Sequence, residues 1–150
     1  MRYAKLVFMV LAPAVALMAA DPFVGTWKLN PAKSKFNAGA PYQEATITIS
    51  ESGSDRDVAF KGTAANGAPI SLHYTVPANG GTGKIDGPYD AVSVKLLKAR
   101  ERETSYSKGG KVLYTAHSTL SKDGKTFTNT VKGTNSAGQT MDAVTVYDKQ

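Results

Sequence analysis

The sequence predicts an all-β protein, a single closed antiparallel up-and-down β-barrel of about eight to ten strands with a short helical turn after the first strand. Apolar and polar residues alternate with a period of two through most of the chain, as in strands with one buried face. Glycine-containing pairs suited to tight turns separate these segments at regular spacing. The short connections favour a barrel over a sandwich, which needs longer crossovers, and closure removes exposed strand edges.

The first twenty residues are expected to be a secretory signal peptide. Arg2 and Lys5 form a basic start, residues 6–18 are apolar apart from a proline, and Ala19 and Ala20 are small. The apolar run is too short to span a bilayer comfortably, so we expect cleavage near Ala20 rather than a membrane anchor. The mature protein, residues 21–150, is then one exported barrel domain, periplasmic or secreted, with no membrane span and expected to be monomeric.

The first strand is expected over residues 24–30, followed by a helical turn over residues 31–36. Asn30 suits the N-cap position, Pro31 suits the first turn, and Pro41 prevents continuation. Further strands are expected at residues 43–50, 58–60, 70–76, 92–96, 100–106, 112–120, 126–132 and 141–147. The glycine-rich segment 77–88 is expected to be a mobile loop, and similar K-G-T-x-x-x-G sequences at 61–67 and 132–138 predict two similar hairpins.

Composition argues against several functional classes. Removing Arg2 and Lys5 from 18 basic residues leaves 16 against 12 acidic, a dispersed excess of +4 that does not indicate nucleic-acid binding. Without cysteine there is neither a disulfide framework nor a thiol nucleophile. His73 and His117 both lie in the polar phase of their strands, so we expect no metal site and no cofactor. Residues 100–103, with alternating arginine and glutamate, are expected to form a solvated charged edge or face rather than a catalytic carboxylate pair.

Two end segments resemble the calycin superfamily, which comprises lipocalins and fatty-acid-binding proteins. Residues 23–29 (FVGTWKL) carry the G-x-W signature at Gly25 and Trp27, and residues 144–149 (VTVYDK) resemble a fatty-acid-binding-protein closing strand. The start D-P-F-V-G-T-W-K-L-N also resembles short exported bacterial lipocalin-like proteins of unknown role.

The resemblance implies a ligand-binding barrel but not the fatty-acid carboxylate clamp. Thr145 and Tyr147 stand where fatty-acid-binding proteins usually carry Arg-x-Tyr, so the arginine is absent. Residues 31–41 are too short for two lid helices. Independently of the family, Gly25 allows the first strand to bend and Trp27 is expected to plug the barrel floor, with its N–H bonded to a partner.

Polar residues in the inward phase suggest a binding function without catalysis. Buried hydroxyl and amide groups need hydrogen-bond partners, which neighbouring side chains, water or a ligand can supply. The residues expected to contact a small hydrophobic or amphipathic ligand are Tyr74, Tyr114, Asn129, Thr145 and Tyr147. The alternative is a structural or protein-interaction barrel of the cell envelope with a packed interior. No recognisable nucleophile and base arrangement indicates an enzyme.

Overall fold

The computed structural model describes residues 20–150, so the expected signal peptide lies, apart from Ala20, outside the described residues. In chain order the elements are β1 (Gly25–Leu29), the 3₁₀ turn η1 (Pro31–Lys33), β2 (Lys35–Ala38), β3 (Tyr42–Ser52), β4 (Asp55–Ala64), β5 (Pro69–Pro77), β6 (Gly81–Asp86), β7 (Ala91–Lys98), β8 (Glu101–Lys108), β9 (Lys111–Leu120), β10 (Thr126–Thr134) and β11 (Thr140–Lys149).

Ten strands, β1 and β3–β11, form a closed antiparallel barrel in up-and-down order. Each strand from β3 onward pairs with the next, and β1 closes the ring by pairing with both β3 and β11. This confirms the predicted fold, including the helical turn after the first strand. The two hairpins predicted from their shared sequence are also present, joining β4 to β5 and β10 to β11.

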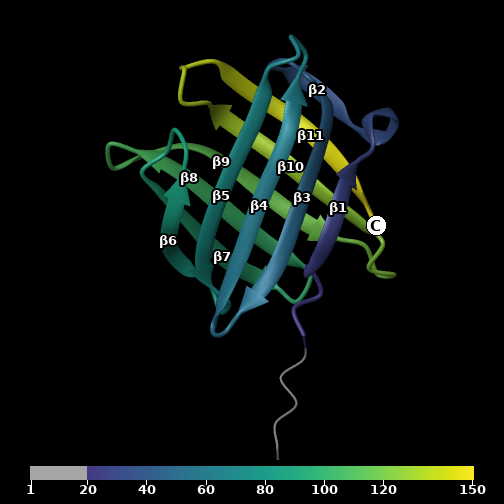
Figure 1. Ribbon diagram of the computed structural model, residues 1–150, viewed down its shortest axis with the longest axis vertical. Coiled ribbons are helices and arrows are strands. Elements are labelled where there is room, and N and C mark those ends of the chain that lie inside the picture. The colour runs from purple at the N-terminus through teal and green to yellow at the C-terminus, as the bar shows by residue number, and fades with distance from the viewer. Residues whose placement is uncertain (1–19) are drawn as a thin grey trace, which may run out of the picture.

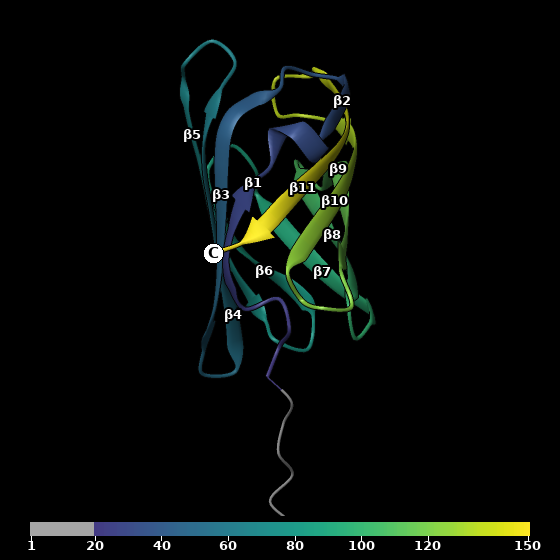
Figure 2. The same ribbon diagram turned by 90° about the vertical axis from the view of Figure 1, so that its right-hand side faces the viewer.

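The barrel is flattened into two layers (Figures 1 and 2). Strands β3, β4 and β5 form one layer, and β8 to β11 cross behind them at a steep angle. In Figure 2 the β4–β5 hairpin, β2 and the β10–β11 turn lie at the top, and the described chain enters at the bottom. The inward side chains of the closed sheet lie between these two layers.

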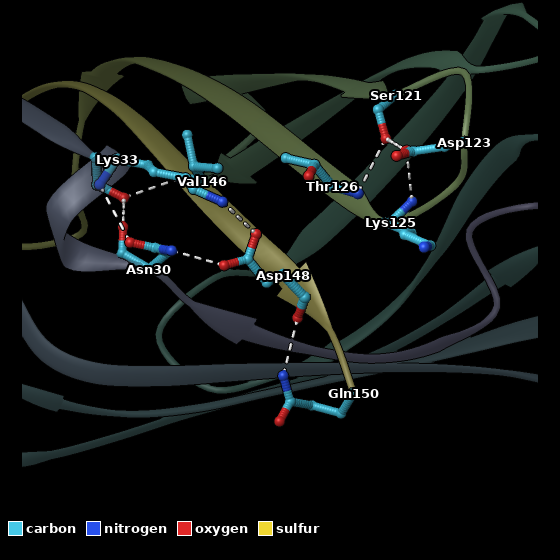
Figure 3. A network of polar contacts seen from close by, with 10 residues as sticks. Asn30, Lys33, Ser121, Asp123, Lys125, Thr126, Val146, Asp148 and Gln150 are labelled. Atoms are coloured by element: carbon cyan, nitrogen blue, oxygen red, sulfur yellow. Dashed lines mark hydrogen bonds and ion pairs between the residues drawn. The ribbon is translucent and has the colours of Figure 1, made fainter.

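Polar contacts fasten the start of the barrel to its last strand (Figure 3). Asn30 Nδ2 donates to Asp148 Oδ2 at 2.6 Å, and the Lys33 ammonium lies 3.0 Å from Asp148 Oδ1. Asn30 also caps η1, since its Oδ1 accepts from the Lys33 amide at 3.2 Å. These two contacts, the asparagine first, lower the pKa of the Asp148 carboxyl. These contacts therefore join the beginning of the barrel to its last strand, although the residues are far apart in the sequence.

Aromatic residues pack the closed end. Trp27 is 0% exposed, and its Nε1 donates to the Phe23 carbonyl at 2.9 Å. Phe127 meets both rings edge-on, with centroids 5.4 Å from Phe23 and 5.5 Å from Trp27. Gly25 adopts φ +143°, and a Cβ there would lie 3.0 Å from Lys149 Cε. The N-terminal segment thus crosses beneath the barrel and fills its floor.

Two segments differ from the sequence-based expectation. The helical turn ends at Lys33 instead of residue 36, because residues 35–38 pair as β2 with the part of β11 that β1 leaves uncovered. The segment 77–88, expected to be a mobile loop, contains β6. Its glycines permit a close approach: a Cβ on Gly83 would lie 1.9 Å from the Thr75 carbonyl oxygen. Glycine has a low strand propensity, so the sequence predicted a loop here, although β6 needs glycine in order to pack this close to β5.

We expect Gly83→Ala to destabilise the barrel, because the added methyl group forces β6 away from β5. Overpacking of this kind costs about 1–3 kcal/mol or more. Urea unfolding of the purified protein measures the change. Thr82→Ala, at an exposed neighbour on the same strand, is the control and is expected to change stability by less than about 0.5 kcal/mol. Equal stability of the two variants would contradict the close approach.

Candidate functional site

The barrel contains a cavity of about 670 Å³. Its lining extends from the middle of the strands to the end formed by segment 38–42 and the β4–β5 and β10–β11 turns, so that end is the mouth. Trp27 and Phe23 lie below the cavity and do not line it. The interior is therefore packed at one end and hollow toward the other.

All five residues predicted to contact a ligand line this one cavity: Tyr74, Tyr114, Asn129, Thr145 and Tyr147. They come from four strands, β5, β9, β10 and β11. Asn129 is partly buried, and the other four side chains are buried. The period-two phase of each strand was enough to place them inside, because a closed sheet directs every alternate side chain toward the same axis.

Six tyrosines line the cavity, and they are all the tyrosines of the described chain: Tyr42, Tyr74, Tyr89, Tyr106, Tyr114 and Tyr147. Tyr106 and Tyr114 stack with centroids 4.3 Å apart and planes at 13°. Tyr89, from the β6–β7 connection, packs against both at 5.6 and 5.5 Å. Burial raises the pKa of Tyr106 and Tyr114 well above the usual range, so both phenols are neutral donors at physiological pH.

The two walls of the cavity differ in polarity. The wall formed by β3, β4 and β5 contributes mainly aliphatic and aromatic groups, including Ile47, Val58, Phe60 and Leu72. The wall formed by β8 to β11 adds hydroxyl, amide and guanidinium groups, in particular Arg102, Thr104, Ser118, Asn129 and Thr145. A ligand in this space would meet an apolar surface on one side and hydrogen-bonding groups on the other.

The expectation of a solvated charged face over residues 100–103 is wrong for Arg102. This side chain points inward, is 5% exposed, and lies with its guanidinium carbon 3.8 Å from the Phe23 ring centroid. Burial lowers its pKa to about 10, which still leaves the group charged at neutral pH. A second arginine, Arg56, is 3% exposed and pairs with Asp21.

Sequence reasoning placed Arg102 at the surface because Glu101 and Glu103 flank it, and it did not single out Arg56. One signal was available for Arg102, since it shares its phase with Thr104 and Tyr106 on β8, and an aromatic residue at that spacing marks the inward face.

The histidines do not build a second site. His73 is partly exposed and bridges Asp57 and Asp86, with nitrogen–oxygen distances of 2.8 and 3.3 Å. These carboxylates, Asp86 first, raise the pKa of the imidazole. Within residues 20–150, no three potential metal-ligating side chains of histidine, aspartate or glutamate gather closely enough to hold an ion. In the same range no helix has the length and apolar character needed to cross a bilayer.

No protein-family model matches the sequence, and a comparison with curated proteins finds no match. The fold is similar to solved β-barrels. A redesigned barrel, mFAP1, bound to DFHBI is 16% identical with a TM-score of 0.51, and covers 87% of this chain and 98% of its own. EF1p2_mFAP2b bound to DFHBI is 13% identical with a TM-score of 0.54, covering 88% and 97%. Zebrafish ileal bile acid-binding protein complexed with cholic acid is 13% identical with a TM-score of 0.46, covering 86% and 99%. At these identities the likeness concerns the fold.

The buried phenols give an expected pH dependence. Burial raises the pKa of Tyr42, Tyr106, Tyr114 and Tyr147, so the unfolded chain releases these protons at lower pH than the folded protein. The free energy of unfolding is therefore expected to fall as the pH rises above about 10. The lowered pKa of Arg102 makes the free energy of unfolding rise with pH in the same range, but the four tyrosines together outweigh this one group. Urea unfolding at several pH values, with tyrosinate absorbance in parallel, measures both effects.

Tyr106→Phe is the matched variant and is expected to lose less stability on going from neutral to alkaline pH. If all the tyrosines of the native protein ionised at the same pH as those of the urea-unfolded chain, the result would contradict burial of the tyrosine cluster.

Proposed function

We propose that this protein binds a small, largely apolar or amphipathic molecule in the barrel cavity, as a monomer and without catalysing a reaction. The observation that carries the proposal is a cavity of about 670 Å³ lined by aromatic and aliphatic residues with a few polar groups. Volumes of about 300–1,000 Å³ with this kind of lining are typical of small-molecule sites.

The volume favours binding over the alternative of a structural barrel with a packed interior. Tight packing leaves few voids larger than a water molecule, and such voids are much smaller than this cavity. Keeping several hydroxyl groups inside an empty barrel also costs stability unless they find partners. A ligand that packs against the aromatic rings and accepts hydrogen bonds from the phenols accounts for both features.

The comparison with solved structures supports the same proposal at the level of the fold. Barrels with TM-scores of 0.51 and 0.54 to this chain are described as bound to DFHBI. A barrel of this architecture can therefore hold a small organic molecule. The identity of the ligand in the present protein depends on its own lining residues.

The ligand-binding proposal predicts a molecule that can be extracted from the purified protein with organic solvent and identified by mass spectrometry. It also predicts saturable binding of the neutral probe N-phenylnaphthylamine, detected by energy transfer from Trp27, the only tryptophan. Ala116 is buried and lines the cavity, so Ala116→Phe is expected to fill that space and weaken probe binding about tenfold or more.

The control is Val112→Phe, which adds a ring on the same strand at a side chain that is 51% exposed. It is expected to leave probe affinity unchanged. Absence of both an extracted molecule and saturable probe binding would count against the binding proposal and in favour of the structural alternative.

We also propose that the chain is exported and cleaved next to Ala20. The amide of Asp21 lies 3.3 Å from Glu51 Oε1, so an ammonium group created there by cleavage would face a carboxylate. Expression of the full chain in a Gram-negative bacterium is expected to give a periplasmic protein whose intact mass begins at Asp21. A full-length product retained in the cytoplasm would contradict export.

A further inference from the structure

A row of polar side chains crosses the cavity wall. Arg102 of β8 is in register with Ser118 of β9, Ser118 with Asn129 of β10, and Asn129 with Thr145 of β11. All four side chains line the cavity. The next inward-facing set of paired residues toward the mouth is mostly apolar and consists of Thr104, Ala116, Val131 and Ala143. The row containing Arg102 therefore places hydrogen-bonding groups from four consecutive strands side by side.

One side-chain hydrogen bond within this row engages the amide oxygen of Asn129 and leaves its amide nitrogen available. Ser118 Oγ donates to Asn129 Oδ1 at 2.6 Å, which occupies the amide oxygen. The amide nitrogen of Asn129 donates to none of the described residues, so its N–H groups remain available. The Arg102 guanidinium likewise makes no hydrogen bond within residues 20–150, and its contact with Asp21 Oδ2 is 3.9 Å long. Asn129, with an available amide donor, and Arg102, with a guanidinium that makes no hydrogen bond, are therefore both lining residues of the same cavity.

The charges around the closed end leave an excess of positive charge. Arg56 and Arg102 share one nearby carboxylate, that of Asp21, and Arg56 takes the closer contact. Arg56 also donates to the Ala78 carbonyl at 3.1 Å, while its Nε and Nη1 are buried without a partner in the described chain. Among the described residues that line the cavity, Arg102 is the only charged one. A buried cation without a full counterion is costly, and an anion supplied by a ligand removes that cost.

We propose that the ligand carries an anionic head, a carboxylate or sulfonate, that binds Arg102 and Asn129, with its apolar body extending toward the tyrosines and the mouth. This inference rests on the proposed function and specifies its ligand class. Guanidinium and amide N–H groups are suitable donors for the oxygens of such a head.

A matched pair of fluorescent probes tests the charge preference. Anilinonaphthalene sulfonate and N-phenylnaphthylamine share an aromatic body, but only the first carries an anionic group. The wild-type protein is expected to bind the sulfonate at least about tenfold more tightly. Arg102→Met is expected to weaken sulfonate binding by about tenfold or more and to change neutral-probe binding by a clearly smaller factor, whereas Arg102→Lys is expected to restore part of the lost sulfonate affinity.

Arg100→Met is the control, because it removes an exposed cation two residues away. It is expected to change neither affinity. Asn129→Leu provides a second variant if Arg102→Met does not fold, and it is expected to weaken the sulfonate selectively. Equal affinities of the wild-type protein for both probes would overturn the anionic head and leave the binding proposal intact. Failure of both probes to bind, together with the absence of an extracted molecule, would overturn the binding proposal itself.

Discussion

Closure of the sheet is the constraint on which the rest of this structure depends. It rests on a short pairing of β1 with the end of β11, where Trp27, Lys28 and Leu29 face Lys149, Asp148 and Tyr147. The Asn30, Lys33 and Asp148 contacts reinforce the pairing from outside. Because the ring is closed, inward residues of ten strands share one interior. An open sheet of the same strands would expose its apolar face and the backbone groups of its edges.

The N-terminal segment makes the two ends of the barrel different. Phe23, Trp27 and Phe127 fill the floor with aromatic contacts, and the Trp27 N–H is bonded to the Phe23 carbonyl. Asp21, two residues before Phe23, provides the carboxylate for the buried arginines. Toward the mouth the interior is hollow, and tyrosine rings are part of its lining. One packed end and one open end give the cavity a direction, so a bound molecule would have a defined orientation.

Polarity differs across the cavity as well as along it. Aliphatic groups of β3 to β5 provide contact area that does not depend on ligand orientation. The polar row on β8 to β11 adds directional donors and one positive charge in a region shielded from bulk water, where electrostatic interactions are stronger than at the surface. Apolar area and a few well-placed polar groups together suit an amphipathic molecule.

The sequence by itself determined the fold class and the inward position of the predicted residues. A strand has a side-chain period of two, so Tyr74, Tyr114 and Tyr147 are assigned to the inner face from local alternation alone. The place of Trp27 at the barrel floor and the helical turn that begins after Asn30 were likewise predicted from local patterns. Alternation identifies the inner face of each strand, but it does not say which inward residues of different strands are neighbours.

The tertiary structure alone decided β6, β2, the buried arginines and the row that joins Arg102 to Asn129. The glycines of β6 predict a loop when only the local sequence is considered. Their role, which is to let β6 approach β5 closely, depends on a strand pairing that the local sequence does not show. The pairing of β2 depends on how much of β11 is left uncovered by β1. Arg102 was expected at the surface because Glu101 and Glu103 flank it in the sequence. Its contacts with Phe23 and Asp21, which come far earlier in the chain, form only when the barrel closes. Cross-strand register and ion pairing are long-range properties, and local alternation carries no information about them.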